Sequence, residues 1–244
     1  MPCALCRRER QLCKSHIIPD FLYARMFEGG KKAYVLSTDA SVRPTKVPTG
    51  VYELLLCLDC ETQLSVWENY ARRVIYGGEP LFIPEYTPVG LHFRGLDYKK
   101  FKLFQLSMLW KANVTQRSEF RYCNMSRGRR ERLRKMLLEG DPGTPREFGC
   151  ILLSSRNLST QLKDFVQMPE FMRIKKAIYQ RFVAGGMFWM YCIPNAHPMA
   201  LKTRVVINRR GQLHIIMNEQ HSNEYVARLA HELHERGNLR AAKD

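Results

Sequence analysis

Two Cys-x-x-Cys pairs are the strongest chemical signal in the chain: Cys3 with Cys6, and Cys57 with Cys60. Each pair places two sulfur ligands on one tight turn, and four thiolates can complete the tetrahedral shell of Zn²⁺. We therefore predict a structural Zn²⁺ site with these four ligands and no open position for chemistry. The alternative is two unrelated pairs of buried cysteines, because free cysteine is common in protein cores.

The segment Ser15-His16-Ile17-Ile18-Pro19 lies between the two pairs. The order Cys-x-x-Cys, His-Ile-Ile-Pro, then Leu-Cys-x-x-Cys leading into a helix resembles the HNH family of nucleases, whose ββα-metal fold is often held by such a zinc site. The resemblance is confined to the N-terminal stretch that holds both pairs. It implies that His16 is the general base that activates the attacking water. The alternative for His16 is a strand histidine that is hydrogen-bonded to a backbone carbonyl.

The resemblance also implies a second metal position, where this sequence departs from the family. The residue after the last cysteine is usually a histidine or asparagine ligand, and here it is Glu61; the residue before the base is usually an acid, and here it is Ser15. A carboxylate suits a hard cation, so the expected catalytic Mg²⁺ or Mn²⁺ would be held by Glu61 with help from Ser15 and Glu68. Glu61 and Glu68 fall on one face of a helix. The central asparagine of the family has no clear counterpart.

The expected function is therefore a metal-dependent endonuclease that hydrolyses phosphodiester bonds in DNA rather than RNA. By analogy, small proteins of this kind act as effectors of bacterial defence or restriction systems. Two alternatives stay open. The changed metal position favours a catalytically inactive, zinc-stapled nucleic-acid-binding module, and residues 149–244 can instead be a surface that docks onto a protein partner or a second copy.

The net charge points to a polyanionic partner. Lysine and arginine total 39 against 23 aspartate and glutamate, a formal charge of +16, and a field of this size favours nucleic acid. Two basic runs, at residues 117–135 and 172–210, are expected to contact phosphates or, alternatively, to be solvated faces. The residues of the first run that we assign to nucleic-acid binding are Arg117, Arg121, Arg127, Arg129, Arg130, Arg132, Arg134 and Lys135.

The composition and hydropathy favour a cytoplasmic protein without a membrane partner. Hydrophobic residues make up 45% of the chain, enough for a proper core. The longest near-uniform apolar run, Phe182–Ile193, is short for a membrane span, and the first residues lack the apolar stretch of a secretory signal. Eight cysteines in a chain without a secretory signal indicate a reducing compartment.

The pattern of the whole chain predicts an α+β fold with an HNH-like domain at residues 1–78, a linker at 79–98 and a basic α+β domain at 99–244. In the first domain we expect a short strand or hairpin around Arg10–Ile18, a brief helix, a strand and a longer helix. The last three are expected at Asp20–Met26, Ala33–Leu36 and Glu61–Tyr76, with Gly77-Gly78 ending the longer helix.

In the second domain, Asp97–Val114 is apolar all round and is expected to be a core helix, whereas Gly128–Glu139 is basic on one side. A small antiparallel sheet should follow, with a hairpin turn at Arg209–Gln212. Its strands are expected at Gly149–Leu153, Phe182–Ile193, Arg204–Asn208 and Leu213–Asn218, and further helices at Leu162–Val166, Pro169–Tyr179 and Asn223–Glu235. We interpret the histidines of the last helix, His231 and His234, as part of a solvated helix rather than a metal site.

Overall fold

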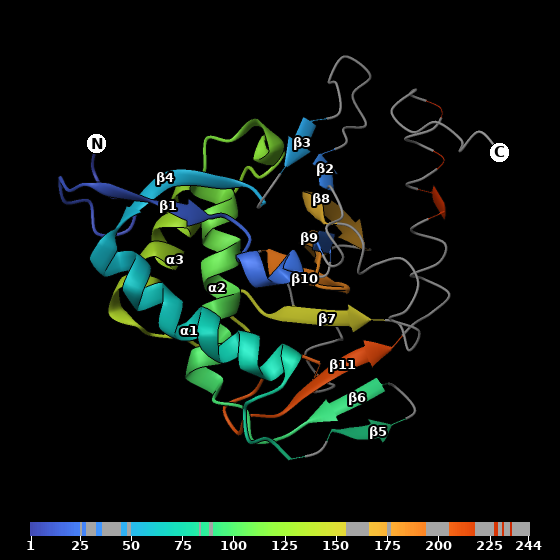
Figure 1. The fold of residues 1–244 in the computed structure, drawn as a ribbon. Coiled ribbons are helices and arrows are strands. Elements are labelled where there is room, and N and C mark those ends of the chain that lie inside the picture. Colours follow the sequence, from blue (N-terminus) through green and yellow to red (C-terminus); the bar gives the residue numbers. More distant parts are fainter. Residues whose placement is uncertain are drawn as a thin grey trace.

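The computed structural model describes residues 1–24, 26–27, 33–35, 45–47, 50–82, 84–87, 90–154, 166–174, 177–193, 205–217, 227–228, 231 and 235. Within these residues the chain has a mixed α+β fold with three α-helices and a large mixed sheet (Figure 1). The helices are α1 (Leu58–Tyr76), α2 (Tyr98–Val114) and α3 (Arg127–Glu139). The fold class is thus α+β, as predicted.

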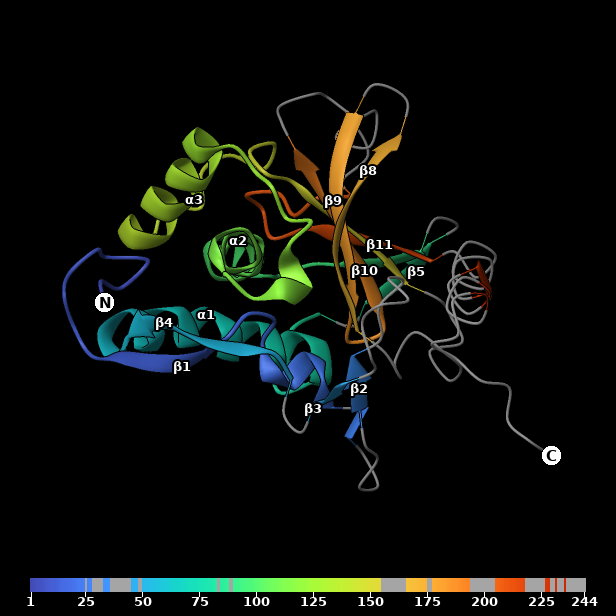
Figure 2. The same cartoon turned by 90° about the horizontal axis from the view of Figure 1, so that it is seen from above.

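Helix α2 is the core of the molecule. Every residue from Phe101 to Asn113 is buried, as its all-round apolar sequence predicts. Asp97 caps its first turn by accepting a hydrogen bond from the Lys100 backbone N–H at 2.9 Å. Figure 2 looks nearly along α2, which lies between α1 and α3 on one side and the sheet on the other. The two helices and the sheet therefore share one hydrophobic core through α2.

The main sheet has seven strands in the order β5-β6-β11-β7-β10-β9-β8. All neighbours are antiparallel except β11 and β7, which are parallel. The strands are β5 (Glu85–Thr87), β6 (Gly90–Phe93), β7 (Cys150–Ser154), β8 (Gln167–Ile174), β9 (Ala177–Ala184), β10 (Met187–Ile193) and β11 (Leu213–Met217). The sheet is thus larger than predicted, and it is mixed rather than purely antiparallel.

A small ribbon forms the other β-structure near the N-terminus. Strand β1 (Leu12–His16) pairs antiparallel with β4 (Tyr52–Cys57), and β4 runs directly into α1. Figure 1 shows this ribbon above α1, on the opposite side of the view from β5 and β6. A separate two-stranded pair joins β2 (Ala33–Val35) to β3 (Thr45–Val47). A short 3-10 turn at Asp20–Leu22 stands where we predicted a brief helix.

Three predicted helices are confirmed, those at Glu61–Tyr76, Asp97–Val114 and Gly128–Glu139, and α1 begins three residues earlier than expected. Helix α3 ends at Gly140, which has the left-handed conformation at φ 63°. The helix predicted at Pro169–Tyr179 is wrong, because these residues belong to β8 and β9. The two strands pair with each other as a hairpin, and this pairing overrides the helical spacing of the apolar residues. The helix predicted at Leu162–Val166 lies outside the described residues except for Val166, and that at Asn223–Glu235 lies largely outside them.

Two strand predictions change in detail. Phe182–Ile193 is not one strand but the end of β9, a Gly185-Gly186 turn and β10. Both glycines have positive φ, 60° and 75°, as a tight hairpin turn of the primed type requires. Val205–Asn208 is not part of a strand, although Val205, Val206 and Ile207 are buried. Asn208 instead closes the predicted turn, because its N–H donates to the Gln212 carbonyl at 3.0 Å.

Residues 79–98, predicted as a linker, contribute β5 and β6 to the main sheet. One core cluster includes residues from Cys3 to Leu213. The boundaries of the predicted domains stay a prediction. No helix in the described part of the chain is long and apolar enough to cross a membrane.

Candidate functional site

The four predicted zinc ligands come together. The sulfur atoms of Cys3, Cys6, Cys57 and Cys60 all lie within 4.8 Å of one another, and the Cys6 and Cys57 sulfurs are 3.8 Å apart. Two sulfurs of a tetrahedral site with Zn–S bonds of about 2.3 Å are about 3.8 Å apart. The cluster can therefore hold a metal ion such as zinc, and among the described residues it is the one group of three or more ligand side chains that can do so.

The first cysteine pair lies on a tight turn that is closed by its own backbone. The Cys3 N–H donates to the Arg8 carbonyl at 3.0 Å, and the Arg7 N–H donates to the Cys3 carbonyl at 2.8 Å. Arg7 has φ 64°, the left-handed conformation that is uncommon outside glycine. The Ala4 N–H also donates to the Leu55 carbonyl of β4 at 3.0 Å. The turn is thus fixed to the strand that carries the second pair.

The second pair lies at the start of α1. Cys57 is the N-cap residue of α1, and Cys60 is in its first turn. The unpaired N–H groups and the dipole at a helix start favour negative charge, which stabilises thiolates. The Cys57 backbone N–H donates to the Cys3 sulfur at 3.3 Å, so it links the two pairs.

The thiols of the cluster differ in how readily they ionise. Burial opposes ionisation of Cys3, but hydrogen bonds from the backbone of Cys57, Cys6 and Leu5 lower its pKa to about 7. The pKa of Cys60 is raised, first by burial and then by the neighbouring thiols of Cys57 and Cys3. Four sulfurs this close cannot all carry negative charge without a cation among them. The donor set therefore fits a metal that binds soft thiolates.

Ser15 and Glu61, which the family resemblance places at the second metal position, also lie together. Ser15 is fully buried in β1, and its hydroxyl donates to Glu61 Oε2 at 2.6 Å. Glu61 follows Cys60 directly in the first turns of α1, and the Ser65 hydroxyl donates to its backbone carbonyl at 2.7 Å. The contact joins the end of β1 to the start of α1, where Glu61 is the residue directly after Cys60.

His16 ends β1 beside Tyr52. The two residues are direct partners across the ribbon, and their rings meet edge-on with centroids 6.0 Å apart. Successive side chains of a strand point to opposite faces. His16 is therefore next to Ser15 in the chain but on the other face of the ribbon, where it is half-buried.

Glu68 is not beside Glu61 but has a different partner. Its carboxylate accepts a hydrogen bond from Lys111 Nζ at 2.7 Å, and the Lys111 side chain is 1% exposed. Seven residues of helix separate Glu61 from Glu68 by about 10 Å. The structure thus brings Ser15 and Glu61 together and places Glu68 in an ion pair between α1 and α2.

The predicted nucleic-acid-binding residues fall into two groups. Several are held in ion pairs: Arg117 with Glu119 at 2.7 Å, Arg132 with Glu147 at 2.7 Å, and Arg134 with Glu131 at 2.9 Å. In contrast, the remaining basic side chains of α3 make no ion pair within the described part of the chain. These are Arg127, Arg129, Arg130 and Lys135, of which Arg127 and Lys135 are exposed.

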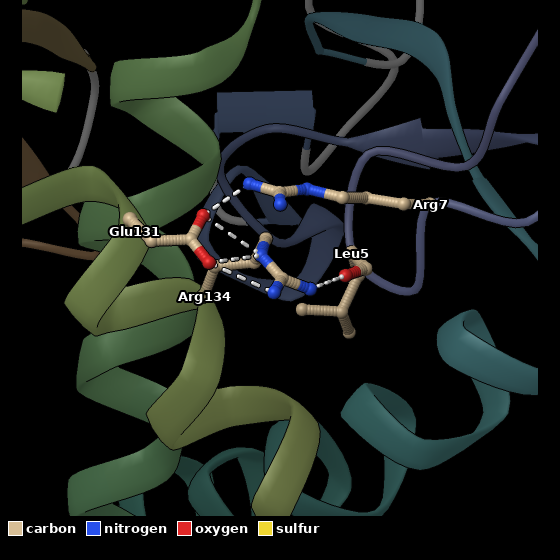
Figure 3. Close-up of polar contacts among 4 residues, drawn as sticks. All are labelled: Leu5, Arg7, Glu131 and Arg134. Atoms are coloured by element: carbon tan, nitrogen blue, oxygen red, sulfur yellow. Dashed lines mark hydrogen bonds and ion pairs between the residues drawn. The ribbon is translucent and has the colours of Figure 1, made fainter. Parts of the chain in front are cut away.

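Arg134 has a structural role that its sequence context does not reveal (Figure 3). Its guanidinium donates to Glu131 and, at 2.5 Å, to the backbone carbonyl of Leu5 inside the first cysteine turn. Arg7, at the end of that turn, forms an ion pair with the same carboxylate. Through these contacts, helix α3 fixes the turn that carries Cys3 and Cys6.

We expect Arg134→Met to destabilise the protein by about 1 to 3 kcal/mol, because the partly buried Leu5 carbonyl loses its charged donor. Zinc should also dissociate faster in a chelator competition. Arg132→Met is the matched control, since Arg132 is on the same helix but pairs with Glu147 at the surface; its cost should stay below about 1 kcal/mol. Equal unfolding midpoints of the two variants would show that Arg134 does not support the cysteine turn.

Two site features were missed by the sequence reasoning. Glu53 accepts hydrogen bonds from the Thr115 hydroxyl at 2.5 Å and from the Gln116 N–H at 3.2 Å, so it ties β4 to the end of α2. Tyr52 shares the outer face of the ribbon with His16. The alternation of Tyr52, Glu53 and Leu54 carried a strand signal, but nothing local identified their partners.

Comparison of the chain with protein-family models, curated proteins and solved structures yields no match. The assignment of a function therefore depends on the geometry of this site and on the resemblance of its motifs.

Proposed function

We propose that the protein is an HNH-like, metal-dependent endonuclease that hydrolyses phosphodiester bonds in DNA. The observation that carries the proposal is the unit of two antiparallel strands and a helix formed by β1, β4 and α1. The cysteine cluster closes this unit, Ser15 contacts Glu61 within it, and His16 ends its first strand. These are the positions that the family resemblance gives to a structural metal, a catalytic metal and a base.

In this proposal His16 acts as the general base. A neutral imidazole nitrogen accepts a proton from water, the water oxygen attacks phosphorus, and the bond to the leaving oxygen breaks. A histidine suits this task because its ordinary pKa lies close to neutral pH. The edge-on contact with Tyr52 orients the imidazole ring.

Glu61 and Ser15 supply oxygen ligands, which fit a hard divalent cation. Such cations often bind through one or two carboxylates and complete their shell with water and substrate phosphate. Mg²⁺ or Mn²⁺ bound there would supply stabilisation of the negative charge that develops on phosphate. The hydrogen bond from Ser15 holds the Glu61 carboxylate in a fixed orientation at the start of α1.

The positive charge of the protein supports a nucleic-acid substrate. Two exposed basic side chains of α3, Arg127 and Lys135, make no ion pair in the described residues and are suited to contact phosphates. Arg132 and Arg134 are already engaged with carboxylates, so we assign them to the fold instead.

A second candidate function is nucleic-acid binding without cleavage. Two observations favour it: one Glu61 oxygen is already used by Ser15, and Glu68 is committed to Lys111. His16 also leaves the ribbon on the face opposite to Ser15. In this case the ribbon and α3 bind the strand, and the cysteine cluster maintains their shape.

Glu61→Gln tests the endonuclease directly. We expect at least a tenfold loss of Mg²⁺-dependent or Mn²⁺-dependent plasmid nicking, because a neutral amide is a poor ligand for a hard cation. Asp59→Asn is the matched control: it removes the same charge from the first turn of α1, where Asp59 makes only a surface ion pair with Arg10. Equal nicking by both variants would remove Glu61 from the metal site. Fluorescence-detected DNA binding should be unchanged in both.

A further inference from the structure

The outer face of the β1–β4 ribbon is unusual in composition. Lys14 pairs with Leu54 and His16 with Tyr52, so these four side chains share this face. Ser15 and Glu53 point to the opposite face, toward α1 and the end of α2. Tyr52 is 38% exposed and Leu54 is 51% exposed. A two-stranded ribbon thus presents an exposed aromatic ring beside the proposed base.

A cation lies over the Tyr52 ring. Lys14 Nζ lies 5.1 Å from the ring centroid. Aromatic rings interleaved with basic side chains are the arrangement that proteins use to bind single-stranded nucleic acid.

The segment after α2 extends this surface. The hydrogen bonds from Thr115 and Gln116 to Glu53 hold it against β4, and Figure 1 shows the short helix that follows lying beside the start of β4. This helix is η3, Ser118–Phe120. Directly after it, Tyr122 is 62% exposed with the Arg121 guanidinium 5.0 Å from its ring centroid. A second exposed ring with its own cation therefore lies on the segment that Glu53 anchors.

The Tyr52 hydroxyl makes no hydrogen bond within the described part of the chain. No polar contact of this hydroxyl therefore accounts for the exposed position of the ring. A base in a duplex is stacked between its neighbours and cannot place its face on a side chain. An unpaired base can do so, whatever its identity, because every base has a π-face. An exposed ring beside a cation therefore suits an unpaired base better than a base in a duplex.

We propose that Tyr52 stacks on an unpaired base of single-stranded nucleic acid, with Lys14 at the adjacent phosphate, so that the strand passes His16. The inference rests on the proposed function for its class of partner and deepens it by naming the preferred substrate: single strands or unpaired segments. It gives the outer face of the ribbon a role that the metal-binding residues do not supply.

The test is a binding measurement on zinc-loaded protein without added Mg²⁺ or Mn²⁺, so that cleavage does not interfere. A labelled single-stranded oligonucleotide and the duplex of the same sequence are titrated at fixed salt. Tyr52→Ala should weaken single-strand binding roughly 5- to 100-fold, the effect of losing one stacked base. It should leave duplex binding unchanged, and Tyr52→Phe should bind like the wild type.

Tyr86→Ala is the matched control. Tyr86 is an exposed tyrosine, 72% accessible, in β5 at the far edge of the sheet from the ribbon. It should have no effect on either substrate. Unchanged single-strand affinity in Tyr52→Ala, or an equal loss on both substrates, would overturn the stacking site. Binding of neither substrate by the wild type would overturn it as well, and would leave a protein partner as the occupant of this face.

Cleavage assays separate this inference from the proposed function. Wild-type protein that cuts nothing but shows the Tyr52-dependent preference for single strands would retain the stacking site and contradict the endonuclease. Cutting of single strands by Tyr52→Ala at the wild-type rate would support the endonuclease and contradict the stacking site.

Discussion

Cys57→Ser is expected to release the bound metal and unfold the ribbon and the start of α1. Cys57 is 2% exposed, is the N-cap residue of α1, and contributes a sulfur to the four-cysteine cluster. A structural zinc site contributes its binding free energy to folding, about 10 to 16 kcal/mol in small zinc domains. We expect less than one equivalent of zinc in the purified variant and a lower unfolding midpoint.

Cys13→Ser is the control for this prediction. Cys13 lies in β1, close in sequence to the first cysteine pair, but it is outside the cluster. Its replacement should leave zinc content and unfolding midpoint near wild type. If Cys57→Ser kept one equivalent of zinc and full stability, the cluster would not be a structural metal site.

His16→Ala is expected to lower cleavage by about 10²- to 10⁴-fold, the usual contribution of a general base. Because His16 is half-buried at the end of a strand, its loss should cost little stability and leave zinc content unchanged. Nicking rate, thermal unfolding and DNA affinity are measured on the same preparation.

His231→Ala is the control, because it removes an exposed histidine that is distant in sequence from the ribbon. It should nick like the wild type. An aggregated or zinc-free His16→Ala protein would show that His16 supports the fold, and wild-type nicking by His16→Ala would remove it from the mechanism.

The features predictable from sequence are those with a local physical cause. The cysteine spacing identified the four members of the cluster, because a Cys-x-x-Cys pair places both of its sulfurs on one turn. The all-round apolar sequence of Asp97–Val114 identified the core helix. Glycines after α1 and α3 marked both helix ends.

The features that depended on pairing between strands could not be predicted from local pattern. Residues 79–98 look like a linker, yet β6 finds its neighbour in β11, more than a hundred residues away. Pro169–Tyr179 has helical spacing, but pairing of β8 with β9 decides its structure, and the ion pair between Arg181 and Glu170 accompanies that pairing. The register is visible only once both strands are in place.

The same limit applies to the site. Glu68 has the right spacing to join Glu61 on one helix face, but a buried lysine from α2 takes its carboxylate. Arg134 looks like one more phosphate contact, whereas its partners are Glu131 and the cysteine turn. Residue type and spacing indicate which residues could bind metal or phosphate. Contacts with residues of other elements determine which of these side chains are available to do so.

The most direct test of the central claim is cleavage by the wild-type protein itself. Zinc-loaded protein is incubated with supercoiled plasmid and with circular single-stranded DNA, with Mg²⁺, with Mn²⁺ or with no added metal. Omission of metal is a better control than a chelator, which would also compete for zinc. We predict nicking or cutting only when Mg²⁺ or Mn²⁺ is added. Salt-dependent retention of DNA without cleavage under every condition would contradict the endonuclease and favour the binding module.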